Sequence, residues 1–159
     1  MALLTFRAPD LDDVDAAMQC LAFYSREAYQ AQKNPVDWAV MRDSLTRLFT
    51  AGNFMRVAGF DENLRIHALT FGFVGNTFWA EPCTAFDLFY VTPEHRGTPA
   101  ARQMLEAALA QLRSVNCGYV YAGAESGMGE RNEKLFNNLF RRHGFVDVGG
   151  GRLLLDMRG

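Results

Sequence analysis

The chain has 159 residues, of which 49% are hydrophobic, so residues 1–159 are expected to form a single domain with a sizeable core. A formal net charge of −2 argues against nucleic-acid binding, and no apolar run is long enough for a membrane span, so we expect neither nucleic acid nor membrane as a partner. The N-terminal stretch lacks the features of a signal peptide, and the three cysteines have no metal-ligand spacing, which is typical of reduced thiols in a cytoplasmic protein.

The N-terminal half predicts a strand, two helices and a strand pair. In order, we expect a strand at 3–7, a helix from about 10 to 31, a helix from 35 to about 51, and strands at 54–60 and 65–74. Asn34 and Pro35 fit the N-cap and first position of the second helix, because the first helical residue does not need an N–H. Gly75 and Asn76 are interpreted as the turn after the strand pair.

The C-terminal half predicts alternating strands and helices. In order, we expect a strand that begins near 77 or 83 and reaches 91, a helix from 99 to about 115, a strand at 117–122, a helix at 132–143, and a hairpin with strands at 145–148 and 153–157. A strand, a helix and the next strand in sequence imply a parallel strand pair. The complete order indicates an α/β protein with a mixed sheet.

One stretch of this half suits the binding of an anion. The apolar strand at 86–91 leads into a polar turn, and Thr98 and Pro99 fit the N-cap and first residue of the following helix. A helix N-terminus presents free backbone N–H groups and the positive end of a dipole, and Arg96 and Arg102 add positive charge. The pattern indicates a phosphate site, although an ordinary capped helix with solvated arginines fits it as well.

The segment VTPEHRGTPAARQML resembles the acyl-CoA-binding motif of the GNAT superfamily of N-acetyltransferases. The family core is Arg/Gln-x-x-Gly-x-Gly/Ala, and the chain has Arg96 and Ala101 at its ends but Pro99 in place of the middle glycine. Because proline has no N–H, one backbone donor to a pyrophosphate is missing there. The resemblance implies acetyl-CoA as co-substrate. Its pyrophosphate would be held by main-chain N–H groups and one hydroxyl, from Gly97, Thr98, Ala100 and Ala101.

The segment from Glu133 to Phe145 is similar to the late helix of the same family, Asn-x-x-Ala-x-x-Leu-Tyr-x-x-x-Gly-Phe. Leu139 and Gly144 match this pattern, and Asn132 lies one residue before the expected Asn. Phe140 replaces the Tyr that in many members acts as general acid toward the CoA thiolate. By position, Asn132 and Phe140 are expected beside the cofactor.

The resemblance also implies a fold and a path for the cofactor. The family has a mixed, mostly antiparallel central sheet of about six to seven strands flanked by four helices. Its motif-bearing strand splays from the next strand, and the pantetheine arm of the cofactor lies between the two. Main-chain groups of Phe89 and Val91 would pair with that arm in this chain.

Acetyl transfer to an amine requires a base, because an ammonium group is not a nucleophile. Asp87 is the first candidate, since it is the lone charge in an apolar run where some family members carry a carboxylate; it also fits a strand residue that faces water. Glu81 is the second candidate and equally fits an exposed loop residue. Tyr90 is a candidate acid if it faces the cleft, and otherwise belongs to the core. The three histidines are scattered, so we predict no metal site.

The leading hypothesis is direct transfer of an acetyl group from acetyl-CoA to a primary amine of a small molecule or a peptide. The rival is a non-catalytic CoA-binding or protein-interaction module on a degenerate GNAT fold, which Pro99 and Phe140 favour. Dimers are common in the family, so the resemblance implies that this chain can form a homodimer. The sequence contains no signature of the acceptor itself.

Overall fold

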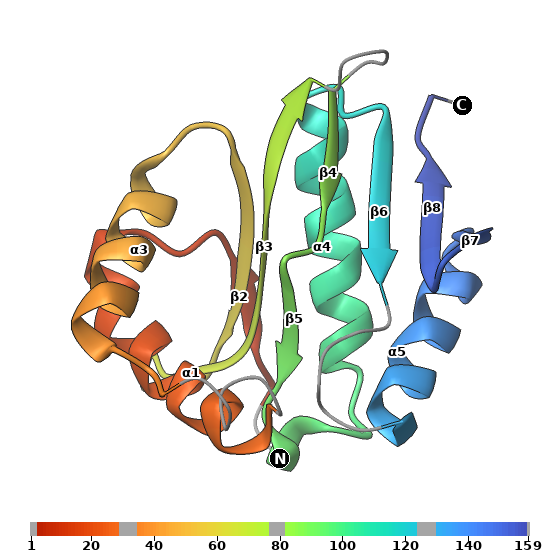
Figure 1. The fold of residues 1–159 in the computed structure, drawn as a ribbon. Coiled ribbons are helices and arrows are strands. Elements are labelled where there is room, and N and C mark those ends of the chain that lie inside the picture. Colours follow the sequence, from red (N-terminus) through yellow and green to blue (C-terminus); the bar gives the residue numbers. More distant parts are fainter. Residues whose placement is uncertain (1–2, 29–34, 77–81, 124–129, 159) are drawn as a thin grey trace.

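The computed structural model describes residues 3–28, 35–76, 82–123 and 130–158 (Figure 1). Its strands are β1 (Thr5–Arg7), β2 (Phe54–Phe60), β3 (Ile66–Asn76), β4 (Pro82–Ala85), β5 (Leu88–Val91), β6 (Tyr119–Gly123), β7 (Val146–Gly149) and β8 (Arg152–Asp156). Its α-helices are α1 (Val14–Glu27), α3 (Trp38–Thr50), α4 (Ala100–Ser114) and α5 (Glu130–Arg142), and short 3-10 turns lie at Leu11–Asp13 and Pro93–His95. No helix in these ranges is long and apolar enough to cross a membrane.

The strands form one sheet in the order β1-β2-β3-β4-β6-β8-β7. The strand β5 lies outside this order and pairs with β3, which also pairs with β4. Each pairing is antiparallel except that of β4 with β6. This parallel pair is the one that the strand-helix-strand pattern predicts, because α4 carries the chain back to the end of the sheet where β4 begins. The predicted mixed, mostly antiparallel sheet with flanking helices is therefore confirmed.

The helices cover the two faces of the sheet and bury two cores (Figure 1). Leu21 of α1 and Leu45 of α3 belong to the core on one face, and Met104 of α4 belongs to the core on the other. Successive residues of a strand point to opposite faces. Tyr90 accordingly packs into the α1 and α3 core, whereas Val91 packs into the α4 and α5 core. The side of the sheet on which a β5 residue can act is thus fixed by its position along the strand.

Two residues separate β4 from β5, and their N–H groups point to different neighbouring strands. Phe86 donates to the Tyr121 carbonyl of β6 at 3.0 Å, and Asp87 donates to the Phe71 carbonyl of β3 at 3.0 Å. After this break, β5 pairs with β3 and no longer with β6 within the described part of the chain. The strand that leads into the turn at 92–97 therefore separates from β6, as the family resemblance implies (Figure 1).

The start of the second helix differs from the prediction. It begins at Trp38 and not at Pro35, because the Asp37 carboxylate caps it by accepting the N–H groups two and three residues ahead at 3.1 and 3.2 Å. A carboxylate at this end also complements the helix dipole. Asn34, the expected cap, lies outside the described residues.

The predicted turn at Gly75 and Asn76 is wrong, because β3 continues through both residues. They pair with Cys83 and Pro82 of β4. The two strands approach closely along this length: a Cβ atom on Gly72 would overlap the Ala85 carbonyl oxygen. A long β3 thus holds β4 in the sheet up to the break at Asp87.

Candidate functional site

The loop between β5 and α4 is shaped by a left-handed glycine and a threonine hydroxyl. Gly97 has φ = +79°, a conformation that glycine adopts at little cost. The Thr98 hydroxyl donates to the His95 carbonyl and accepts the Ala100 N–H at 3.3 Å. Pro99 follows with φ = −68° and α4 begins at Ala100, so the predicted helix start is shifted by one residue.

The loop leaves main-chain donors available at the N-terminus of α4. Thr98 N–H is directed to the His95 carbonyl at 3.4 Å, and Ala100 N–H bonds the threonine hydroxyl, so these two expected donors already have partners. Within the described residues, no hydrogen bond uses the N–H groups of Gly97, Ala101 or Arg102. A first helical turn has no intrahelical acceptors for its N–H groups, so these three suit an anion.

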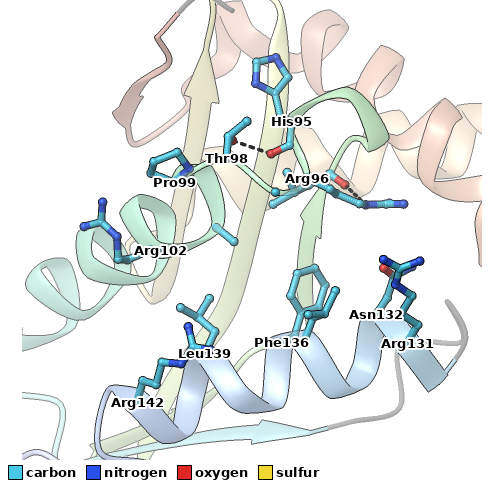
Figure 2. A pocket seen from close by; sticks show the side chains of 14 residues that line it. His95, Arg96, Thr98, Pro99, Arg102, Arg131, Asn132, Phe136, Leu139 and Arg142 are labelled. Carbon is cyan, nitrogen blue, oxygen red and sulfur yellow. Dashed lines mark hydrogen bonds between the residues drawn. The ribbon is translucent and has the colours of Figure 1, made fainter.

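A cavity of about 870 Å³ lies between this loop and α5. The loop and α4 contribute Arg96, Gly97, Thr98, Pro99, Ala101 and Arg102 to its lining, after Val91 and His95. The helix α5 contributes Arg131, Asn132, Leu135, Phe136, Leu139 and Arg142. Figure 2 shows the two groups facing each other across the cavity. Four arginine side chains therefore surround an apolar floor, which suits a ligand with both phosphate groups and an apolar arm.

Arg96 borders the cavity, but its guanidinium bonds α1. Nη1 lies 2.7 Å from Glu27 Oε2, Nη2 donates to Glu27 Oε1 at 2.9 Å, and Nε donates to the Val91 carbonyl at 3.0 Å. The Tyr90 hydroxyl donates to the same Glu27 Oε1 at 2.6 Å. The charge of Arg96 is therefore paired with Glu27. This pairing connects the loop that borders the cavity to the end of α1.

Glu27 makes this connection sensitive to pH. Burial by itself would raise the pKa of Glu27, but the hydrogen bonds from Arg96 and Tyr90 and the charge of Arg96 outweigh it and lower the pKa below 4.5. A carboxylate with a lowered pKa in the folded state stabilises the fold above its unfolded-state pKa, and this stabilisation is lost as the pH falls through the folded-state pKa.

We therefore expect Glu27→Gln to lower the free energy of unfolding at pH 7 by about 1–2 kcal/mol, allowing for the partial exposure of both partners. The difference from the wild type should shrink below pH 4.5, where Glu27 of the wild type begins to gain a proton. Urea unfolding between pH 7 and pH 3 measures this difference. The exposed Glu62→Gln is the control, and a pH-independent Glu27 effect would contradict the ion-pair account.

The candidate catalytic residues occupy different environments. Asp87 is exposed and lies at the break between β4 and β5, on the chain segment where the strands diverge. Tyr90 has no exposed surface, points toward α1 and has a raised pKa because of burial and its bond to Glu27. It therefore lies on the side of the sheet away from the cavity. Glu81 lies outside the described residues.

The expected cofactor residues of α5 also differ in position. Asn132 lines the cavity, as its place in the motif implies. Phe140 is 3% exposed and packs on Phe86 and Phe89, with ring centroids 5.7 and 5.1 Å apart. It is a core residue, whereas Phe136, which also packs on Phe89, lines the cavity. The aromatic cluster thus supports the cavity floor.

Sequence reasoning missed several residues of the site. Arg131 and Arg142 recur with Leu135 and Leu139 at helical spacing, so a helical projection of α5 would have placed them on one face. Glu27 had no local signal, because its partner Arg96 is 69 positions away in the sequence.

A strand that splays before an open helix N-terminus, opposite a cationic helix, suits a cofactor with phosphate groups. The chain belongs to the Acetyltransferase (GNAT) family, because the sequence model of that family matches residues 21–145. Its fold and family are consistent with acyl transfer from acetyl-CoA. No curated protein sequence matches the chain.

Solved structures with the same fold cover nearly all of the chain. A GNAT-family acetyltransferase from Staphylococcus aureus has a TM-score of 0.72 at 9% identity, over 98% of this chain and 99% of its own. An aminoglycoside antibiotic 6'-N-acetyltransferase from Acinetobacter baumannii has a TM-score of 0.67 at 11% identity, over 92% of both chains. A predicted acetyltransferase from Clostridium acetobutylicum, solved with acetyl-CoA, has a TM-score of 0.68 at 14% identity, over 93% of both. At these identities the likeness establishes the fold.

Proposed function

We propose that this chain transfers an acetyl group from acetyl-CoA to a primary amine of a small molecule or a peptide, by direct attack of the amine. The observation that carries the proposal is the set of unused N–H groups of Gly97, Ala101 and Arg102, which border the cavity lined by four arginines. Main-chain donors and guanidinium groups together suit a diphosphate. Pro99 removes one donor from this set, but the first turn of α4 supplies two others.

The edge of β5 that faces away from β3 supports the expected path of the pantetheine arm. Thr92 N–H bonds the His67 carbonyl of β3 at 2.9 Å, and residues of an antiparallel strand alternate in their bonding direction. Phe89 and Val91 therefore turn their main-chain groups toward the side where β6 has separated. The Val91 carbonyl already accepts from Arg96, so both groups of Phe89 and the N–H of Val91 are the ones left for the cofactor.

Asp87 is the base that we propose, acting directly or through a water molecule. It lies two residues before Phe89, at the break where the strands begin to diverge, and its side chain reaches solvent. An exposed carboxylate there can accept a proton from an ammonium group that approaches the thioester. The tetrahedral oxyanion would also need a hydrogen-bond donor, for which main-chain N–H groups are well suited.

Direct attack is favoured over an acyl-enzyme, because the described thiols are poor nucleophiles. Burial raises the pKa of Cys20 to about 12, so little thiolate forms near pH 7. Cys117 is buried and donates its Sγ–H to the Tyr119 carbonyl at 3.2 Å. Neither thiol forms a disulfide within the described residues, and in a cytoplasmic location, which we also propose, both stay reduced.

A second candidate is a CoA-binding module without turnover. The burial of Phe140 favours it, because this position carries no hydroxyl and does not reach the cavity, so an acid for the CoA thiolate would have to come from elsewhere. Tyr90 does not replace it, since its hydroxyl is held by Glu27.

Acetyl-CoA binding and thiol release together test these alternatives. A hundredfold excess of acetyl-CoA over its Kd should raise Tm by about 5–10 °C. Release of free CoA is then followed with a thiol reagent across a panel of aminoglycosides, polyamines and peptides with free N-termini. Turnover with any amine supports the transferase, binding without turnover supports the module, and the absence of binding contradicts both.

A further inference from the structure

Three side chains with metal-binding atoms meet beside the anion-binding loop. His67 comes from β3, Glu94 and His95 come from the turn after β5, and one candidate ligand atom of each lies within 4.8 Å of the other two. The two imidazole rings have centroids 4.5 Å apart and are inclined at 46°. His95 also lines the arginine-lined cavity, but Figure 2 shows its ring directed away from α5.

The surroundings of His67 hold its ring in one orientation. Asp61 Oδ2 lies 2.8 Å from Nε2, and the other carboxylate oxygen of Asp61 accepts the N–H groups of Asn63 and Arg65 at 2.8 and 3.0 Å. Metal-binding histidines commonly donate their second ring nitrogen to a carboxylate, which fixes the tautomer and increases the basicity of the ligand nitrogen. When Nε2–H donates to Asp61, Nδ1 of a neutral His67 presents its lone pair to the cluster.

The Nδ1 atom of His67 has no hydrogen-bond partner among the described residues. It is buried without a hydrogen bond, although Glu94 Oε1 lies 2.9 Å away, so the two atoms are close but poorly aligned. A lone pair and a carboxylate oxygen at this distance repel each other unless a positive charge accompanies them. A bound cation supplies that charge, and a second proton on His67 is the competing account.

We propose that His67, Glu94 and His95 bind one divalent transition-metal ion of the Zn²⁺ type. Two imidazoles and a carboxylate are ligands for Zn²⁺ and its neighbours, whereas Mg²⁺ and Ca²⁺ prefer oxygen ligands alone. Ligand atoms around tetrahedral Zn²⁺ lie about 3.3 Å apart, given bonds of about 2.0–2.1 Å. Glu94 Oε1, which lies 2.9 Å from His67 Nδ1, therefore has to move slightly away, and Glu94, with 63% of its side chain exposed, has room to rotate.

A metal at this position would fasten the turn to β3 immediately before the anion-binding loop. The His95 carbonyl accepts the Thr98 hydroxyl, so a fixed His95 also fixes the start of α4. We expect the metal to tighten acetyl-CoA binding by preorganising the donors of Gly97 and Ala101. This coupling rests on the proposed function, whereas metal binding itself does not.

The first measurement titrates chelator-treated protein with Zn²⁺ in a calorimeter. One ion per chain is expected, together with a rise in Tm of about 5–10 °C at a hundredfold excess over Kd. Co²⁺ is used as a second probe, because its visible absorption reports the geometry and nitrogen ligation of the bound ion. Failure of both ions to bind would overturn the proposal and favour a doubly protonated His67.

Variants then locate the ion. Glu94→Gln removes an exposed ligand and should weaken Zn²⁺ at least tenfold with little effect on folding. Asp61→Asn keeps all three ligands but weakens the support of His67, and should cost about 10–100-fold in affinity. His143→Gln is the matched control, because His143 directly follows α5 and lies beside Glu106, outside the cluster. Circular dichroism checks that each variant is folded.

The outcomes separate the metal site from the transferase. Unchanged affinity in Glu94→Gln, or equal losses in Glu94→Gln and His143→Gln, would overturn the site. Loss of the ion in Cys83→Ser would place it on a thiol and also overturn it. Zn²⁺ binding without any change in acetyl-CoA affinity would overturn the coupling between the metal and the cofactor. The evidence for Zn²⁺ binding itself would stand even if no amine were acetylated.

Discussion

Asp87→Asn should lower kcat about 10²–10⁴-fold while changing the Kd of acetyl-CoA by less than about threefold. The amide is nearly the same size as the carboxylate but does not accept a proton from the attacking ammonium. Asp87 is exposed and does not line the cavity, so the substitution leaves the cofactor contacts in place. Steady-state thiol release and a separate thermal-shift titration measure the two quantities on the same preparation.

The control for this substitution is Asp43→Asn. Asp43 is also an exposed carboxylate, but it lies on α3 and not at the break between β4 and β5. It changes the net charge by the same amount and should retain the wild-type kcat. If the Asp87 variant turned over the same amine as fast as the wild type, the base would have to be a different residue.

Arg142→Glu should weaken acetyl-CoA binding by at least about 30-fold, because it removes a charge-assisted hydrogen bond and places a carboxylate beside the phosphates. Arg142 reaches the cavity from the last turn of α5, across from Arg102 (Figure 2). The loss should diminish at high ionic strength, since salt screens the exposed charges. Calorimetric titration with CoA at low and high salt measures both effects.

Arg141→Glu is a closely matched control for this change. Arg141 is the neighbouring residue, is exposed as well, and pairs with Asp147 at 3.2 Å outside the cavity. The two variants have the same net charge and lie on the same helix. They differ in the direction of the side chain and in the Asp147 ion pair, which Arg141→Glu also removes. Equal losses of CoA affinity in both would show a general charge effect and would contradict the assignment of the cavity as the diphosphate site.

Much of the fold could be predicted from local patterns. The strand at Phe54–Phe60 and the final hairpin follow from apolar runs separated by turn residues, and the parallel pair follows from the intervening helix. Two signals misled the prediction of boundaries. Asn34 and Pro35 are typical of a helix start, but the Asp37 carboxylate provides the cap. Gly75 is typical of a turn, but its pairing with β4 keeps it in the strand.

The site was predictable only where one contiguous segment builds it. The loop from Arg96 to Ala101 carries its own signature, so the helix N-terminus could be predicted to within one residue, and its anion-binding character stays a prediction. The role of Arg96 could not, because Glu27 reaches it from another element. The same holds for His67 and His95, which antiparallel pairing of β3 with β5 brings together. Contacts between distant segments depend on register, and register is set by the whole sheet.

The most direct test is a crystal structure of the protein with CoA bound. The diphosphate should lie at the start of α4, within hydrogen-bond distance of the N–H groups of Gly97, Ala101 and Arg102, with the pantetheine arm along the open edge of β5. A diphosphate bound elsewhere, or an empty cavity in crystals grown at saturating CoA, would contradict the account.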